Sequence, residues 1–271
     1  MTQLPAVRFG VFGDAHYAKK IYGNRHCEDS AAKLAECVAT FQHARVDFSV
    51  CLGDLIDSAA DPVMEAGYAR TMAAVMAGYA GPWHIVLGNH DVNAFTKARF
   101  LKLCAAGHPP WYSFEVNGIH FMVLDGNHLA DGRDYEEGNF SWDEAWLSAA
   151  QLDWMTADLA SVPDRPTVIL CHENLAQKPP RDDADPHVLR DAPRARALLE
   201  GADMVTGVVQ AHYHEGMEME RNGITYIGVR AMVIGPGLEN NAFAVVSVSA
   251  DGGLTVDGYG QQRDYTLHEG A

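Results

Sequence analysis

The sequence predicts an α/β protein with one mixed sheet or two stacked sheets. Three observations support this class. Short apolar runs typical of buried strands alternate with helical segments up to about residue 100. Hairpin-type strands follow, and 48% hydrophobic with 21% charged residues is the composition of an ordinary globular protein. A chain of 271 residues is long enough to bury a large core.

The first hundred residues predict three buried strands and two helices. Asp29 or Ser30 can cap the first helix, in which Leu34 and Phe41 fall on one face. Pro62 suits the first turn of the second helix, which we expect to run to about residue 79, because proline lacks an amide hydrogen that would be unpaired there. The predicted strands cover residues 7–13, 48–53 and 83–88.

The rest of the chain predicts one more helix, a hairpin and further strands. The pair Asn117-Gly118 is a strong signal for a tight turn. Residues 147–159 have helical spacing. The expected strands are 111–116, 119–125, 167–171, 204–210, 223–229 and 242–248, with long polar loops at about 126–146 and 177–196.

The Pro-rich stretch 177–196 could be a surface loop or a linker between two domains. Candidate site residues lie on both sides of it. We therefore expect a single domain spanning residues 1–271.

The charge and the cysteines restrict the function classes. The net charge of −16 makes the chain a poor partner for nucleic acid or an anionic membrane. No apolar run reaches the length of about 18 residues that spans a bilayer, and the start lacks a secretory signal pattern. The five cysteines are scattered and never spaced C-x-x-C, so we expect reduced thiols in the cytoplasm.

Polar side chains follow five of the predicted strands at the points where those strands end. Ligand sites in open α/β sheets form at the carboxyl ends of strands, so we expect these side chains to meet at one sheet edge. Each fragment alone is a weak signal, but together and in this order they are specific. The residues are Asp14, His16, Asp54, Asn89, His90, Asp91, His172, His212 and His214.

Carboxylate, imidazole and amide side chains suit Mn, Fe or Zn ions rather than copper or an iron–sulfur cluster. If seven of these nine residues are ligands and one carboxylate is shared, each of two metal ions has about four protein ligands. Two metals lower the pKa of bound water and stabilise in-line displacement at phosphorus. An anionic substrate could then approach an acidic protein, because the metals reverse the local field.

This arrangement resembles the calcineurin-like metallophosphoesterase family. The matching motifs are Asp14-Ala15-His16, Gly53-Asp54, Gly88-Asn89-His90-Asp91, His172 and His212-Tyr213-His214, within residues 7–230. The resemblance implies a four-layer α/β/β/α sandwich of two mixed sheets with a dinuclear site. One departure is Ala211, which stands where the family usually has glycine, and we expect intact metal binding despite the extra methyl group.

The resemblance also implies a role for each residue. One metal would take Asp14, His16, Asp54 and His214, and the second would take Asp54, Asn89, His172 and His212. Both His90 and Asp91 would be catalytic. His90 would stabilise the transition state or protonate the leaving oxygen, and Asp91 would orient His90.

Within the family, the residues around Tyr17-Ala18 and Asn24-Arg25 look most like the manganese-dependent ADP-ribose/CDP-alcohol diphosphatases. His16 also fits the class III cyclic-nucleotide and glycerophosphodiester phosphodiesterases. Tyr17, Arg25 and His26 are candidate substrate-binding residues, and the guanidinium of Arg25 could pair with a second phosphate. We expect Trp142, Trp146 and Trp154 to pack in the core and not to form a base-stacking platform.

These observations predict a cytoplasmic, dinuclear metal-dependent phosphoesterase acting on a small phosphorylated substrate. A metal-bridging hydroxide would attack a phosphodiester or a nucleoside-diphosphate-type pyrophosphate in line. The alternatives are a phosphomonoesterase or protein phosphatase of the same fold, a noncatalytic metal-binding scaffold, and a mononuclear zinc hydrolase. The oligomeric state cannot be predicted.

Overall fold

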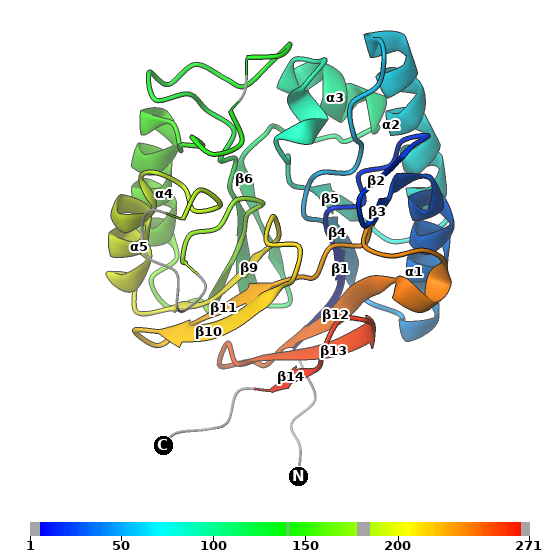
Figure 1. Ribbon diagram of the computed structural model, residues 1–271. Helices are drawn as coiled ribbons and strands as arrows, with labels where there is room; N and C mark the ends of the chain where they lie inside the picture. Colours follow the sequence, from blue (N-terminus) through cyan, green and yellow to red (C-terminus); the bar gives the residue numbers. More distant parts are fainter. Residues whose placement is uncertain (1–5, 140, 178–184, 267–271) are drawn as a thin grey trace.

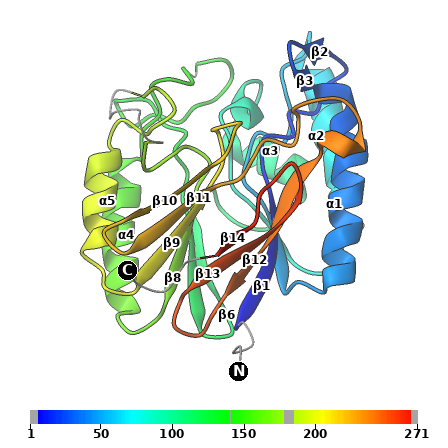
Figure 2. The same ribbon diagram turned by 60° about the horizontal axis from the view of Figure 1, so that its bottom comes forward.

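The computed structural model describes residues 6–139, 141–177 and 185–266. Two six-stranded mixed sheets stack face to face, with helices covering each outer face (Figure 1). Figure 2 shows the same four layers from below. The structure confirms the predicted α/β/β/α sandwich.

The first sheet carries the strands from the amino-terminal part of the chain. β1 lies at its centre, parallel to β4 and antiparallel to β12. The order across the sheet is β14 (Tyr265–Thr266), β13 (Leu254–Gly260), β12 (Ala242–Val248), β1 (Val7–Phe12), β4 (Phe48–Cys51) and β5 (Trp83–Ile85).

The second sheet carries the strands of the middle of the chain. Its four inner strands run parallel to one another, and an antiparallel strand lies at each edge. The order is β10 (Met217–Arg221), β11 (Ile224–Gly228), β9 (Val205–Gln210), β8 (Thr167–Leu170), β7 (Ile119–Val123) and β6 (Tyr112–Val116). A separate small hairpin pairs β2 (Ile21–Tyr22) with β3 (Arg25–His26).

The helices form the two outer layers (Figure 1). α2 begins where Asp61 caps it, since its Oδ1 accepts hydrogen bonds from the amides of Val63 and Met64 at 2.8 and 2.9 Å. The layer on the first sheet is α1 (Ser30–Ala44), α2 (Pro62–Met76) and α3 (Lys97–Leu103), and the layer on the second sheet is α4 (Ala149–Ser161) and α5 (Ala192–Glu200). Among the described residues, no helix is both long enough and apolar enough to span a membrane.

Alternating side chains of the strands supply two different cores. Val7, Phe9 and Val11 of β1 point between the sheets, where they join an apolar cluster with residues of the second sheet. Phe12 belongs to the larger cluster that includes the residues packed beneath the helices. Because both faces are covered, the inner strands are largely apolar and buried, as the sequence indicated.

The predicted strands and helices are present with shifted ends, and several elements are additional. Asn117 and Gly118 both have positive φ, 49° and 86°, as the predicted hairpin turn requires. α3, β10, β13, β14 and the β2–β3 hairpin were not predicted, and α5 begins inside the stretch expected to be a loop. Residues 178–184 of that stretch lie outside the described residues, whereas 126–146 is the long connection we expected.

Candidate metal centre and catalytic cavity

The polar residues that follow the strands meet at one edge of the sandwich. Asp14 and His16 follow β1, Asp54 follows β4, and His172 follows β8. Both His212 and His214 follow β9 on the other sheet. Among the groups whose ligand atoms lie close enough to share a cation are Asp14, His16 and His214, and Asp54, His172 and His212.

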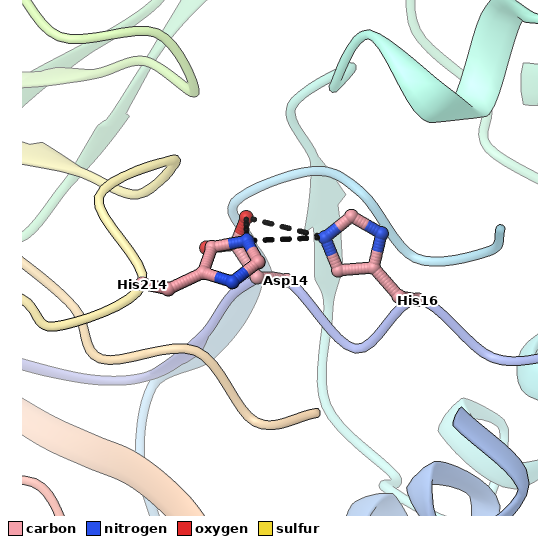
Figure 3. A group of neighbouring side chains, drawn as sticks. All are labelled: Asp14, His16 and His214. Carbon is pink, nitrogen blue, oxygen red and sulfur yellow. Dashed lines mark hydrogen bonds and ion pairs between the residues drawn. The ribbon is translucent and has the colours of Figure 1, made fainter. Parts of the chain in front are cut away.

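The first group draws its side chains from both sheets (Figure 3). His16 Nε2 lies 3.3 Å from His214 Nε2 and 3.7 Å from Asp14 Oδ1. His214 Nε2 lies 3.5 Å from the same oxygen of Asp14. Three potential ligand atoms from segments nearly 200 residues apart therefore surround one point.

Asp54 connects the first group to the second. Its Oδ2 lies 3.4 Å from His16 Nε2 and 3.4 Å from His172 Nε2. His172 Nδ1 donates a hydrogen bond to the carbonyl of Leu52 at 2.7 Å, which leaves Nε2 as the nitrogen facing Asp54. The carboxylate thus has the position of a group shared between two cations.

The backbone around these residues adopts conformations that are rare outside functional sites. Asp14, His16, Asp54 and His212 all have φ between 44° and 64°, in the left-handed region. A side chain at Gly88 would place a Cβ 2.2 Å from the amide nitrogen of Asp54, so only glycine fits there. Four of the nine described non-glycine residues with positive φ therefore lie at the three strand ends that bring the polar atoms together.

Several polar atoms at this edge are buried and have no hydrogen-bond partner. They include Asp14 Oδ1, Asn89 Oδ1, His172 Nε2 and His212 Nε2. Leaving a buried polar atom unsatisfied costs about 1–3 kcal/mol each, so convergent orphan atoms of these types need a compensating group. Carboxylate, amide and imidazole donors of this kind fit two cations of the Mn, Fe or Zn type.

The catalytic candidate His90 is oriented by Asp57. His90 Nδ1 donates to Asp57 Oδ1 at 3.0 Å, and the His90 ring lies 4.7 Å from the ring of His16. Burial alone would lower the pKa of His90, but Asp54 and Asp57 outweigh it and raise the pKa above its usual value. His90 therefore faces the metal groups with its orientation fixed.

Asp91 does not have the role that we predicted for it. Its Oδ1 accepts hydrogen bonds from the amides of Leu55 and Ile56 at 2.9 and 3.3 Å, and its Oδ2 accepts one from Gly88 at 3.0 Å. Asp91 thus fixes the backbone of the Asp54 loop against the Asn89 loop, and the carboxylate that orients His90 is Asp57. Sequence reasoning missed Asp57, although it lies only three residues after Asp54.

A cavity of about 340 Å³ opens over the metal groups. Arg25, one of the candidate substrate-binding residues, lines it. Tyr17 packs its ring against Tyr68, and His26 lies beside Asp29, so neither is among the described residues that line the cavity. The lining residues are Arg25, Asp54, Asn89, His90, Trp142, His187, His212, Tyr213, His214 and Glu215.

Two of these lining residues correct the sequence-based expectations. Trp142 was expected in the core, but its side chain is 44% exposed and faces the cavity. His187 was not singled out at all. The unusual Ala211 is accommodated because its methyl group packs against Gly13, where a side chain would approach to 2.8 Å.

The family described as calcineurin-like phosphoesterase matches residues 7–216, which is most of the chain. The chain belongs to the calcineurin-like phosphoesterase family. As a member, it is a metal-dependent phosphoric ester hydrolase.

Curated relatives and solved structures agree with the calcineurin-like family. The chain is 25% identical over 239 residues to the 3′,5′-cyclic adenosine monophosphate phosphodiesterase CpdA of Haemophilus influenzae, covering 86% of this chain and 79% of that protein. It is 27% identical over 197 residues to CpdA of Escherichia coli, covering 72% and 64% of the two chains. The crystal structure of a dimetal phosphatase from Danio rerio has the same fold, with a TM-score of 0.82 at 22% identity over 97% of this chain and 98% of the other.

Proposed function

We propose that the protein is a dinuclear phosphodiesterase that hydrolyses a phosphodiester or a nucleoside-diphosphate-type pyrophosphate. The observation that carries the proposal is the position of Asp54 Oδ2, equidistant at 3.4 Å from a histidine of each metal-binding group. The curated relatives named as cyclic AMP phosphodiesterases support a diester substrate.

Two metal ions would be held by the two groups of side chains. Asp14, His16 and His214 would hold the first, together with the shared Asp54. The second would take Asn89, His172 and His212 in addition to Asp54. Two bound cations supply Lewis-acid polarisation of the phosphate and activation of a water nucleophile. Mn, Fe and Zn all fit this donor set.

His90 would act on the oxygen that leaves phosphorus. It lines the cavity, and its Nδ1 donates a hydrogen bond to Asp57. The Asp57 carboxylate favours the protonated ring, which can donate its proton to the departing alkoxide. Arg25 would pair with a phosphate oxygen at the mouth of the same cavity.

A substrate comparison tests the proposal. Purified enzyme with added Mn²⁺ should hydrolyse cyclic AMP or ADP-ribose with a higher kcat/KM than the monoester AMP. A preference for monoesters would favour the phosphomonoesterase alternative. Two bound metals without turnover of any phosphate ester would favour the noncatalytic scaffold, and one metal per chain would favour a mononuclear hydrolase.

Two variants test the roles of the residues. Asp54→Asn should lose metal from both groups and abolish turnover, because it removes the shared carboxylate charge. His90→Ala should keep the metal content and lower kcat by about 10²- to 10⁴-fold, the usual contribution of a general acid. If His90→Ala stays fully active, the proposed role of His90 is wrong.

A further inference from the structure

Two aromatic side chains outside the metal-binding groups form one wall of the catalytic cavity. The ring centroid of Trp142 lies 5.2 Å from that of His187 and 6.4 Å from that of His212. Both Trp142 and His187 line the cavity that contains His90 and Arg25. An indole that remains 44% exposed in a concave site offers an apolar face that a ligand ring can cover.

Trp142 is held in this position by hydrogen bonds to the main chain of the two residues that flank it. The carbonyl of Ser141 accepts a hydrogen bond from the hydroxyl of Tyr135 at 2.8 Å. The carbonyl of Asp143, on the other side, accepts one from the guanidinium of Arg190. The backbone is therefore fixed immediately before and after Trp142, and the indole is presented to the cavity on a supported segment.

His187 is oriented by a buried carboxylate. Its Nδ1 and its main-chain amide donate to Asp185 Oδ1 at 2.8 and 3.0 Å. The hydroxyl of Tyr213 donates to Asp185 Oδ2 at 2.5 Å. Since Asp185 accepts from Nδ1, the ring presents Nε2 to a ligand, and in the neutral ring Nε2 is a hydrogen-bond acceptor.

The cavity lining also includes the guanidinium of Arg25. Arg25 comes from β3, whereas Trp142 lies on the connection between β7 and α4 and His187 on the connection between β8 and α5. A ligand in this cavity therefore meets a cation as well as an aromatic ring with a hydrogen-bond acceptor. A volume of about 340 Å³ is within the range of small-ligand sites.

We propose that Trp142 and His187 bind the nucleoside part of the substrate. The indole of Trp142 stacks on the base, and His187 Nε2 accepts a hydrogen bond from a ribose hydroxyl. This inference rests on the proposed function and narrows it, because it selects a base-bearing diester or pyrophosphate over a glycerophosphodiester.

Kinetics of Trp142 variants test the stacking. Trp142→Ala should raise KM for cyclic AMP about tenfold, with a smaller change in kcat, because stacking on an aromatic side chain contributes this much to binding a base. Trp142→Phe should retain most of the affinity. KM for glycerophosphocholine, which has no ring, should stay the same in both variants.

Trp111→Ala is the matched control. The Trp111 ring packs on Trp154 at 5.0 Å and is not among the described lining residues. The KM of Trp111→Ala for cyclic AMP should equal that of the wild type. Equal changes for both substrates in Trp142→Ala, or no change for either, would overturn the stacking role.

A binding measurement separates this inference from the proposed function. AMP should quench the tryptophan fluorescence of the wild type and bind about tenfold more weakly to Trp142→Ala, whether or not the protein turns over a diester. Removing both ribose hydroxyls from AMP should weaken binding to the wild type more than to His187→Ala. Equal AMP affinity in wild type and Trp142→Ala would refute the aromatic wall even in an active phosphodiesterase.

Discussion

Asp57 and Asp91 lie in the same region and are both buried, yet they support different parts of the site. Burial would raise the pKa of Asp57, but the hydrogen bond and the charge of His90 hold it below its usual range. Burial and the nearby Asp54 raise the pKa of Asp91 to about 7. Asp57 thus stabilises a cationic partner, whereas Asp91 satisfies main-chain amides.

This difference leads to a prediction for Asp57→Asn. The variant keeps the size of the side chain but removes the charge that orients His90 and favours its protonation. We expect kcat to fall about 10- to 100-fold, with metal content unchanged, because a partner that orients a site imidazole contributes this much. Steady-state kinetics and metal analysis of the same preparation measure both quantities.

Asp57→Glu is the matched control, because it keeps the charge but displaces it by one methylene group. We expect it to recover part of the lost kcat. Full activity in Asp57→Asn would show that His90 needs no carboxylate partner.

The sequence could predict the residues next to strand ends but not those that reach the site through loops. Asp14, Asp54 and His172 directly follow apolar runs, so the sheet edge could be expected to collect them. Asp57 approaches His90 because its amide bonds to the carbonyl of Tyr17 at 3.2 Å, a contact between loops. Trp142 looked like a core residue, since spacing alone does not show which face of a loop is solvated.

At the scale of elements, one buried lysine connects α1 to the segment beside the metal centre. Lys33 Nζ donates to the carbonyls of Met232, Ile234 and Gly235 at 2.9, 3.1 and 2.8 Å. The neighbouring amide of Val233 donates to the carbonyl of Asp14 at 3.0 Å. Lys33 therefore supports the loop on which the conformation of Asp14 depends.

Lys33→Met should destabilise the protein and weaken metal binding together. The variant fills the space of the lysine but leaves three carbonyls without their charged donor. We expect a loss of about 3 kcal/mol in the free energy of unfolding. Urea unfolding and Mn²⁺ titration measure the two effects. Lys102→Met, at an exposed position, should change neither the stability nor the metal affinity. If Lys33→Met leaves the metal affinity unchanged, the loop that Lys33 supports does not contribute to metal binding.

The strand β5 carries a histidine whose titration affects stability. The ring of His84 stacks on Phe114 at 3.8 Å, and its Nδ1 is hydrogen bonded to the hydroxyl of Tyr112 at 2.8 Å. Burial, with a further contribution from His108, lowers the pKa of His84 from 6.5 to about 4. Between these two values the unfolded chain binds more protons, so protein stability falls as the pH falls through this window.

His84→Phe should remove this part of the pH dependence. Phenylalanine can keep the stacking on Phe114, although it loses the hydrogen bond to Tyr112. Between pH 7 and pH 5, we expect the variant to lose about 2 kcal/mol less stability than the wild type. Urea unfolding at the two pH values measures the difference, and identical losses would show that His84 is not responsible.

Elements were predictable where their signals are local. The Asn117-Gly118 turn and the Asp61-Pro62 helix start depend on conformations fixed within a few residues. α5 was missed because Pro193 lies at its start, within a Pro-rich polar stretch that resembled a loop. β10 lies at the edge of its sheet, and β13 lies next to the two-residue edge strand β14. Both have exposed residues, so they lack the apolar runs that identified the inner strands.

At the scale of the whole molecule, a net charge of −16 surrounds a site whose proposed substrate is an anion. Asp14 and Asp54 add two buried carboxylates at the point where the phosphate must approach. Bound cations reverse this local charge and satisfy the orphaned imidazole and amide atoms. Metal binding should therefore stabilise the entire fold as well as support catalysis, because the two metal-binding groups contain side chains from both sheets.

Removing metal should lower the melting temperature of the protein. At free Mn²⁺ of 100 times its Kd, one site adds about 2.7 kcal/mol to stability, which corresponds to between about 5 and 10 °C in Tm for a chain of this size. Thermal scans with Mn²⁺ and with EDTA measure this shift. In Asp54→Asn the shift should nearly vanish, because neither group keeps its shared carboxylate, while His90→Ala should retain it. A full shift in Asp54→Asn would mean that the stabilising cations bind elsewhere and that the two sheets are not joined through Asp54.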